Sequence, residues 1–301
     1  MLFQILKNAK RLKTMDLSNI NTIKKILKKY DFKLSHTLGQ NFIIDPEVCP
    51  QIVQQSGADK ETGVIEIGPG IGVLTKELAK IEKIVVAIEL DSKLIPGLKE
   101  TLVDFANIQI LNEDILKADL EKLINTHFSG FKKITICANL PYYITTPVIM
   151  KCLEKNLDIK AITFMIQKEV AERICAEVGS RKSGSITVAV NYYSQPEFLF
   201  EVKKESFFPS PKVDSAVIKL TPHDKYKKQV KNKKLFFRVV NAAFAQRRKN
   251  ILNSLSAGLC VGKDPLKKIL LDLNLDKNLR AENLTMEQFI SLTDILDISF
   301  F

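Results

Sequence analysis

The segment Gly63-Val64-Ile65-Glu66-Ile67-Gly68-Pro69-Gly70-Ile71-Gly72 decides the fold of this chain. Its first five residues are mostly apolar and predict a short buried strand, and a helix is predicted from about Val73 to Lys80. Glycines between a strand and a helix let the backbone approach a ligand closely. The spacing is G-x-G-x-G, and Val73 stands where a dinucleotide-binding fingerprint needs a further glycine. The corner therefore predicts a ligand site of another kind.

Predicted strands and helices alternate downstream of this corner. Further strands are predicted at Ile84–Ile88, Ile108–Leu111, Ile134–Ala138 and Ala161–Ile166, and helices at Asp91–Phe105, Lys168–Glu177 and Ile186–Tyr193. Such alternation is typical of a parallel, doubly wound α/β sheet. Two later strands, Glu197–Val202 and Ala216–Leu220, have no long helix between them. We expect these two to pair antiparallel at the edge of the sheet.

The two ends of the chain have a different pattern. Near the start, Ser18 or Asn19 is placed to cap a helix with isoleucines on one face and lysines on the other. Thr221-Pro222 marks a boundary, beyond which the pattern is helical. The predicted helices of the tail are 235–255, 265–271 and 285–296. We therefore predict a basic extension at 1–18, with Met15 as an alternative start, an α/β domain at 19–221 and a small all-helical domain at 222–301.

Charge and composition narrow the class of partner. The chain has 301 residues, 46% of them hydrophobic, and a formal net charge of +11. Ten bases and no acid lie between Lys225 and Lys249, which favours RNA contact over a merely solvated segment. The five cysteines form no C-x-x-C pair, and the three histidines are far apart. We therefore expect reduced thiols, no metal site, no membrane span and a cytoplasmic location.

Acidic side chains end two of the predicted strands. Glu89 ends the second strand about twenty residues after the glycine corner, where a carboxylate can bind both hydroxyls of a ribose. Asp114 follows the third strand and is placed to accept from an adenine amine. Acids at strand ends often only cap helices, so each residue alone is a weak signal. Together they favour an adenosine ligand without a pyrophosphate, and S-adenosylmethionine fits.

The fourth strand ends in Ala138-Asn139-Leu140-Pro141-Tyr142-Tyr143. The amide oxygen and the following carbonyl can accept hydrogen bonds from an exocyclic amine, and an aromatic ring beside them can hold a flat base. An equally good interpretation of this segment alone is a proline-terminated strand with a capping asparagine. The remainder of the chain has to decide between the two.

Six ordered motifs then connect the chain to a known family. They are L-G-Q-N-F at Leu38–Phe42, E-I-G-P-G-x-G at Glu66–Gly72, N-L-P-Y at Asn139–Tyr142, Q-K-E-V-A-E-R at Gln167–Arg173, F-x-P-x-P-K-V-D-S at Phe207–Ser215 and A-F-x-x-R-R-K at Ala243–Lys249. With these motifs, the chain resembles the ribosomal RNA adenine N6,N6-dimethyltransferases over about Leu38 to Leu255, and within them the small-subunit branch. One departure is Ser183-Gly184-Ser185, where the family often has Tyr-Gly-Arg; it puts substrate contacts by this loop in doubt.

The resemblance implies a Rossmann-like, S-adenosylmethionine-dependent methyltransferase sheet. It implies dimethylation of N6 on two adjacent adenines in a loop of small-subunit rRNA, with a role in small-subunit biogenesis. The implied partners are this rRNA and the pre-ribosomal small subunit. We expect the protein to be a monomer. The residues implied are Asn41, Ile43, Gly68, Glu89, Asp114 and Asn139 for the cofactor, and Asn139, Tyr142 and Phe207 for the target adenine. The residues themselves add Leu140 and Pro141 to the predicted catalytic set, and the clustered charge adds Lys212, Arg247, Arg248 and Lys249 as predicted RNA contacts.

Three rival hypotheses remain at this point. The same chemistry could act on large-subunit rRNA, as in antibiotic-resistance relatives, or on adenine in DNA. The fold could also belong to a non-catalytic RNA-binding assembly factor, although the intact Asn139–Tyr142 segment and Glu89 argue against lost activity.

Overall fold

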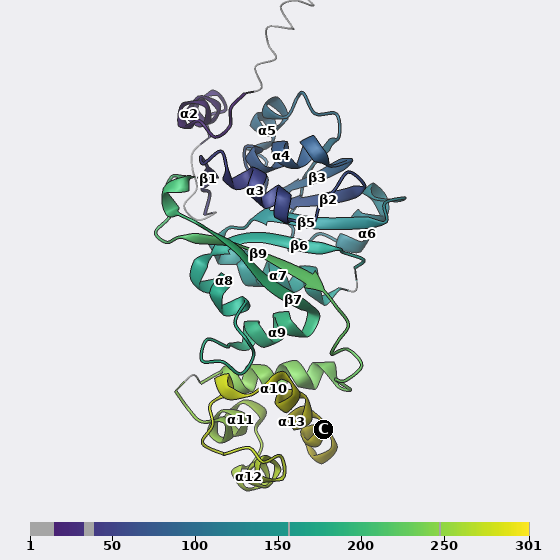
Figure 1. Cartoon of the computed structure of the whole chain (residues 1–301), viewed down its shortest axis with the longest axis vertical. Coiled ribbons are helices and arrows are strands. Elements are labelled where there is room, and N and C mark those ends of the chain that lie inside the picture. The colour runs from purple at the N-terminus through teal and green to yellow at the C-terminus, as the bar shows by residue number, and fades with distance from the viewer. Residues whose placement is uncertain (1–14, 33–38, 156, 247, 301) are drawn as a thin grey trace, which may run out of the picture. The chain divides into compact units, whose positions relative to one another are not determined.

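The computed structural model of the chain describes residues 15–32, 39–155, 157–246 and 248–300 (Figure 1). Most of the predicted N-terminal extension, together with Leu38 and Arg247, lies outside the described residues. Within the described residues, no helix has both the length and the apolar character that crossing a membrane requires.

A seven-stranded sheet is the centre of the fold, and its order is β4-β3-β2-β5-β6-β9-β7 (Figure 1). The strands are β2 (Thr62–Ile67), β3 (Ile84–Glu89), β4 (Ile108–Asn112), β5 (Lys133–Asn139), β6 (Ala161–Gln167), β7 (Ser194–Val202) and β9 (Ser215–Pro222). The pairs β4–β3, β3–β2, β2–β5 and β5–β6 are parallel. The predicted α/β class and the parallel strands are confirmed, and the two late strands β9 and β7 are neighbours at one edge.

The burial of the central strands explains why they were predictable. Every residue of β2 is buried, which is the pattern of a parallel strand covered on both faces. The register places Ile67 opposite Ile88 on β3 and opposite Ala138 on β5. Adjacent parallel strands therefore end at the same edge of the sheet, and the residues that follow them meet there.

Helices α3 (Val48–Gln55), α4 (Val73–Ile81), α5 (Ile95–Thr101) and α6 (Leu120–His127) connect these elements. The prediction of one long helix over Asp91–Phe105 is wrong, because α5 has seven residues. Asp91 instead forms a turn, since its carboxylate accepts from the backbone N–H of Lys93 at 3.1 Å. A proline in the first turn then favours a helix start at Ile95.

Two compact units divide the chain. The first takes residues up to 145, 158–165 and 201–215, and the second takes residues 146–157, 166–200 and 216–301. The second unit contains most of α7 (Thr145–Glu154), together with α8 (Lys168–Ile174), α9 (Ser185–Tyr193), α10 (Lys233–Phe244), α11 (Ile251–Leu259), α12 (Lys263–Asp272) and α13 (Met286–Phe300). The tail is helical, as predicted.

The tail differs from the prediction in one respect. The single helix expected over 235–255 is wrong, because the chain forms α10 and α11 with a turn between them. Asn250 is extended, and its side chain accepts from the backbone N–H of Asn253 at 3.0 Å. This N-cap starts a new helix, and hydrophobic periodicity does not reveal such a start.

In the first unit, helix α2 (Ile20–Lys29) packs against Phe42 and Leu94, two residues that line the pocket described below. Asn19 caps the helix through two backbone N–H groups, and Ile23, Ile26 and Leu27 are buried. They belong to one apolar cluster with Phe42, Ile71 and Leu94. A two-stranded sheet of β1 (Phe42–Ile43) and β8 (Phe207–Phe208) adjoins it. The short pair therefore brings the F-x-P-x-P motif beside the N-terminal loop.

Candidate functional site

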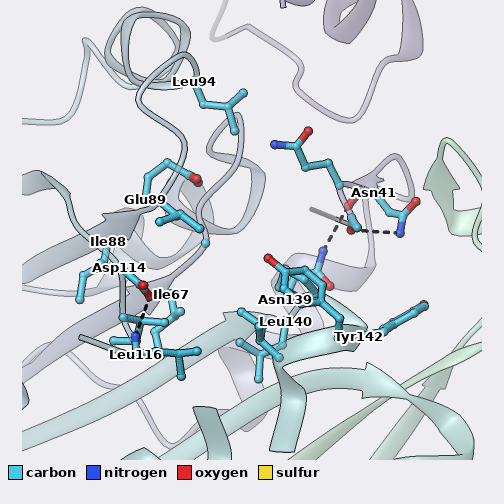
Figure 2. A pocket seen from close by; sticks show the side chains of 18 of the residues that line it. Asn41, Ile67, Ile88, Glu89, Leu94, Asp114, Leu116, Asn139, Leu140 and Tyr142 are labelled. Carbon is cyan, nitrogen blue, oxygen red and sulfur yellow. Dashed lines mark hydrogen bonds between the residues drawn. The ribbon is translucent and has the colours of Figure 1, made fainter. Parts of the chain in front are cut away.

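A pocket of about 240 Å³ lies at the carboxyl ends of the central strands in the first unit. Strand ends supply Ile67, Ile88, Glu89 and Asn139 to its lining, and the loop residues Gly39–Phe42 and the ring of Phe207 complete it. Figure 2 shows Glu89 and Asp114 on one side of the pocket and Asn41, Asn139 and Tyr142 on the other. This is the edge at which open α/β sheets bind their ligands.

The glycine corner opens this pocket to a ligand. Gly68 and Gly70 have φ angles of +70° and +60°, a region that other residues rarely adopt. A Cβ atom on Gly68 would find nothing closer than the Asn139 carbonyl oxygen at 4.0 Å, so this backbone faces open space. A Cβ on Gly70 would meet the Phe42 ring at 3.3 Å. The corner can therefore carry a ligand against bare backbone, while Phe42 limits its far side.

The Glu89 carboxylate is buried at the edge of the pocket, with 6% of the residue exposed. One oxygen accepts from the backbone N–H of Asp91 at 2.8 Å, and the other accepts from that of Gly70 at 3.2 Å. Burial raises the pKa of Glu89, and these two backbone hydrogen bonds oppose the rise. Because each carboxylate oxygen has a second lone pair, Glu89 can still accept from two hydroxyl groups.

For Asp114 the sequence left two roles open, capping of the backbone after β4 and contact with a ligand. Its Oδ1 accepts from the backbone N–H of Leu116 at 2.9 Å and so caps the turn after β4. Its Oδ2 lies 3.9 Å from the ammonium of Lys117, which is mostly exposed. Asp114 also lines the pocket (Figure 2). The capping role and a place beside a ligand are therefore compatible.

Asn139 is held in one orientation by the N-terminal loop. Its Nδ2 donates to the Asn41 carbonyl at 3.3 Å, and the Nδ2 of Asn41 donates to the Gly39 carbonyl at 3.3 Å (Figure 2). Because a carbonyl oxygen only accepts hydrogen bonds, the Asn139 atom that contacts it is the amide nitrogen and not the amide oxygen. No described residue donates to Asn139 Oδ1 or to the Leu140 carbonyl oxygen. Two acceptors on consecutive residues of the pocket wall therefore remain available.

Aromatic side chains form the wall near these acceptors. Tyr142 is half-buried, and its hydroxyl lies 2.9 Å from the hydroxyl of Ser215. Burial raises the pKa of the Tyr142 hydroxyl. Phe207 is buried and lines the pocket, whereas Phe208 packs against the α2 cluster, 5.2 Å below the Lys24 ammonium. Successive strand residues point to opposite sides, so only one of the two phenylalanines can face the site.

The structure does not bring every predicted residue into the pocket. Ile43 lies outside the lining, because it is 3% exposed and pairs with Phe207 across β1 and β8. Lys212 is exposed in the turn before β9, and Arg248 and Lys249 are exposed between α10 and α11. The fourth predicted RNA contact, Arg247, is outside the described residues.

Sequence reasoning missed several residues of the pocket. Leu90, Leu116 and Tyr143 line it and are 50%, 39% and 54% exposed. Each of the three lies within four residues after the polar residue that ends a strand. Their closeness to a strand end is the sequence feature that could have identified them. Among the described residues, no group of three histidines, cysteines or carboxylates could hold a metal.

Comparison with known proteins places this geometry in a family. Residues 31–297 match the family described as ribosomal RNA adenine dimethylase. The chain is 44% identical over 284 residues to ribosomal RNA small subunit methyltransferase A of Geobacillus sp. (strain WCH70), covering 93% of this chain and 98% of that protein.

Two solved structures share the fold. A dimethyladenosine transferase from Plasmodium falciparum is 26% identical with a TM-score of 0.69, and covers 85% of this chain and 97% of its own. The 23S rRNA methyltransferase ErmE is 25% identical with a TM-score of 0.63, and covers 85% and 99%. With a family match over most of its length and relatives above 40% identity, the chain belongs to the ribosomal RNA adenine dimethylase family.

Proposed function

We propose that the chain transfers methyl groups from S-adenosylmethionine to N6 of two adjacent adenines in a loop of small-subunit rRNA, giving N6,N6-dimethyladenosine. The observation that carries the proposal is the pair of available acceptors, Asn139 Oδ1 and the Leu140 carbonyl, in a pocket whose opposite side holds Glu89. Membership of a family described as ribosomal RNA adenine dimethylase supports the dimethyl product.

The residues of the Glu89 side fit an adenosine group. Glu89 would accept from the two ribose hydroxyls, Asp114 from the adenine amine, and the bare backbone of Gly68 would lie against the ligand. Asn41, Ile43 and Asn139 complete the proposed cofactor set, with Ile43 acting from behind the lining. When bound, S-adenosylmethionine supplies a methyl group on a positively charged sulfur, which makes the methyl carbon electrophilic.

On the opposite side, the chain positions the target amine. Asn139 Oδ1 and the Leu140 carbonyl would each accept one N6–H, which favours a tetrahedral nitrogen with its lone pair directed at the methyl carbon. Both oxygens also stabilise the positive charge that develops on N6. Pro141 fixes the backbone between Leu140 and Tyr142. No side chain has to remove a proton before transfer, so the catalytic contribution is positioning.

The target base has to leave its stack to reach these acceptors, at a cost of a few kcal/mol. Tyr142 and Phe207 offer aromatic surfaces at the pocket wall, and stacking contributes about 1–3 kcal/mol per base. The hydroxyl bond to Ser215 keeps the Tyr142 ring in place. A loop suits this requirement, because its bases are already partly unstacked.

RNA contact outside the pocket is assigned to exposed bases. We propose Lys212, Arg247, Arg248 and Lys249 as phosphate contacts, with catalysis in residues 19–221 and additional RNA binding in 222–301. The net charge of +11 supports a polyanionic partner. The proposal includes a monomer that acts on the pre-ribosomal small subunit in the cytoplasm.

The decisive experiment measures methyl transfer from labelled S-adenosylmethionine to isolated small subunits, isolated large subunits and naked DNA. We expect label in the small-subunit rRNA. The likeness to ErmE makes large-subunit rRNA the second candidate, and label confined to large subunits or to DNA would overturn the proposal. An Asn139→Ala variant serves as the control for contaminating activity.

The product is tested separately by mass spectrometry of nucleosides from the reacted subunits. After one transfer N6 keeps a single hydrogen, so one of the two acceptors loses its partner, and the first methyl has to rotate away from the donor. We expect N6,N6-dimethyladenosine when the enzyme is in excess. Monomethyladenosine as the sole end product would contradict the proposed dimethylation.

A further inference from the structure

A second pocket of about 590 Å³ lies wholly within the second unit. Its walls are α8, the segment Arg181–Ile186 at the start of α9, the end of α10 and the short 3-10 helix η3 (Ala281–Asn283). It shares no lining residue with the pocket that holds Glu89 and Asn139. Its volume exceeds that of a phosphate group several times and is in the range of small-molecule sites.

The charges around this second pocket leave a positive excess. Of its described lining residues, Arg173 forms an ion pair with Glu169 at 2.8 Å, and Lys182 forms one with Glu172 at 2.9 Å. Three bases and one acid remain, namely Arg181, Lys249, Arg280 and Glu282. Within the described part of the chain, these three bases form no ion pair. All three are exposed, so they lie at the rim of the pocket.

The inside of the pocket holds an orphaned hydroxyl beside apolar groups. Ser183 is 8% exposed, and its Oγ has no hydrogen-bond partner among the described residues. A buried polar atom without a partner costs about 1–3 kcal/mol. The Oγ is covered in the structure, so a ligand removes that cost once the Ser183 side chain rotates toward the pocket. Phe244 and Ile186 are half-buried in the same lining, and the Phe244 ring lies 5.9 Å from that of Phe289.

We propose that this pocket binds one unpaired nucleotide of the RNA substrate. The phosphate would lie at the rim with Arg181, Lys249 and Arg280, and the base would enter to contact Phe244 and the Ser183 hydroxyl. A hydroxyl can donate or accept, so Ser183 can bond to the edge of any base. The apolar inner wall and the volume are what distinguish this site from a surface that binds anions alone.

The inference rests on the proposed function only in taking the ligand to be RNA. It adds a subsite away from the reacting amine, which would hold the RNA rather than take part in transfer. Its loss should therefore raise KM for the RNA and leave kcat and cofactor binding unchanged, because the interaction is the same in the ground and transition states.

The test measures binding of adenosine 5′-monophosphate, uridine 5′-monophosphate and inorganic phosphate to the full chain by calorimetry. S-adenosylhomocysteine is present at saturation to fill the cofactor side of the first pocket. Uridine 5′-monophosphate lacks the N6 amine that Asn139 and Leu140 would hold, so it is the nucleotide that tests the second pocket. We expect both nucleotides to bind at least tenfold more tightly than phosphate. Ser183→Tyr places a phenol ring in the pocket and should abolish nucleotide binding. Arg280→Glu should weaken it at least tenfold.

Lys277→Glu is the matched control, because Lys277 is an exposed base three residues before Arg280 and lies outside the lining. It should change nucleotide affinity by less than twofold. Because Arg280 is exposed, we expect the Arg280→Glu variant to fold, and it tests the inference even if Ser183→Tyr does not fold. With small subunits as substrate, Arg280→Glu should raise KM at least fivefold relative to Lys277→Glu.

Two results would overturn the inference. One is equal binding of phosphate and nucleotides, which leaves an anion patch only. The other is nucleotide binding that Ser183→Tyr, folded by thermal melting, and Arg280→Glu leave intact. Wild-type protein that binds nucleotides but transfers no methyl group to small subunits would instead refute the proposed function. The two failures are therefore separable.

Discussion

Replacing Glu89 with alanine should weaken cofactor binding while leaving the chain folded. In the structure the carboxylate joins the end of β3 to the glycine corner, through the backbone N–H groups of Gly70 and Asp91. Its remaining lone pairs are the ones that would accept from the ribose hydroxyls. The substitution therefore removes two ligand contacts and also releases the corner from the strand.

The size of the effect follows from these contacts. A hydrogen bond to a charged group contributes roughly 1.5–3 kcal/mol, and two such bonds to one ligand are not additive, so we expect a loss of about 2–4 kcal/mol. At about 1.4 kcal/mol per factor of ten, Kd should rise about 30- to 700-fold. The Gly70 and Asp91 N–H groups border the pocket and can bond to water instead. Unfolding should therefore be affected much less than binding.

Calorimetric titration with S-adenosylhomocysteine measures the change in Kd, and thermal melting measures the change in stability. Glu113→Gln is the matched control. Glu113 lines the same pocket but is exposed, and this substitution removes the same negative charge as Glu89→Ala. Its Kd should stay within about twofold of wild type. Burial raises the pKa of Glu89 above its ordinary value of 4.5. Wild-type affinity should therefore fall as the pH is lowered through that raised pKa, since the protonated carboxyl accepts less well.

A Glu89→Ala variant with unchanged Kd would remove Glu89 from the cofactor site. An equal loss in the Glu113→Gln control would attribute the effect to charge at the pocket mouth. Unfolding of the Glu89→Ala variant would show that the tie to Gly70 is the main role of the carboxylate. In that case Glu89→Gln, which keeps one acceptor oxygen, is the variant to titrate.

Three further predictions concern other parts of the chain. Asn139→Ala should lower kcat by roughly 100- to 1,000-fold, as for the loss of one preorganised hydrogen-bonding group, while RNA binding in a filter assay survives; near-normal turnover would contradict the assignment. Arg248→Ala with Lys249→Ala should reduce the slope of log K against log salt by about 1.5 at unchanged cofactor affinity, and an unmoved slope would make these bases a solvated face. Burial raises the pKa of Glu66 from 4.5 to about 8. Between pH 4.5 and pH 8 the folded protein therefore keeps a proton on Glu66 that the unfolded chain has released. The free energy of unfolding should fall as the pH rises through this window, by up to about 5 kcal/mol. Urea unfolding of wild type and Glu66→Gln at pH 5 and pH 9 should show this fall in wild type and a smaller one in the variant; equal falls would contradict it.

The sheet and the strand-end residues of the site were predictable because both depend on local pattern. Buried parallel strands read as continuous apolar runs, and their carboxyl ends meet at one edge. This is why Glu89, Asp114 and Asn139 could be grouped from their positions alone. The helix over Asp91–Phe105 failed because side-chain capping and a proline shorten it, and these act against an otherwise helical pattern.

The remainder of the site depends on long-range packing. Strands β1 and β8 have two residues each, which is too short for any alternation to be recognised, and their pairing joins Ile43 to Phe207. The second pocket likewise depends on how α8, α10 and η3 pack around Ser183. In the sequence, Ser183 was visible only as part of a departure from the family pattern.

The tie between Asn41 and Asn139 has a consequence for how the site works. The Asn41 backbone carbonyl accepts from Asn139 Nδ2, so the N-terminal loop that contains Asn41 orients the amide that would hold the target amine. Since Oδ1 faces the pocket only while this bond is kept, the acceptor for N6 is set before either substrate binds. Among the described lining residues there is no histidine. The carboxylates of Glu89 and Asp114 accept from backbone N–H groups and lie across the pocket from Asn139. No group of this pocket is therefore arranged as a strong base. Its geometry suits a reaction in which the amine loses its proton to water after transfer, and in which rate depends on how firmly residues 39–41 hold Asn139.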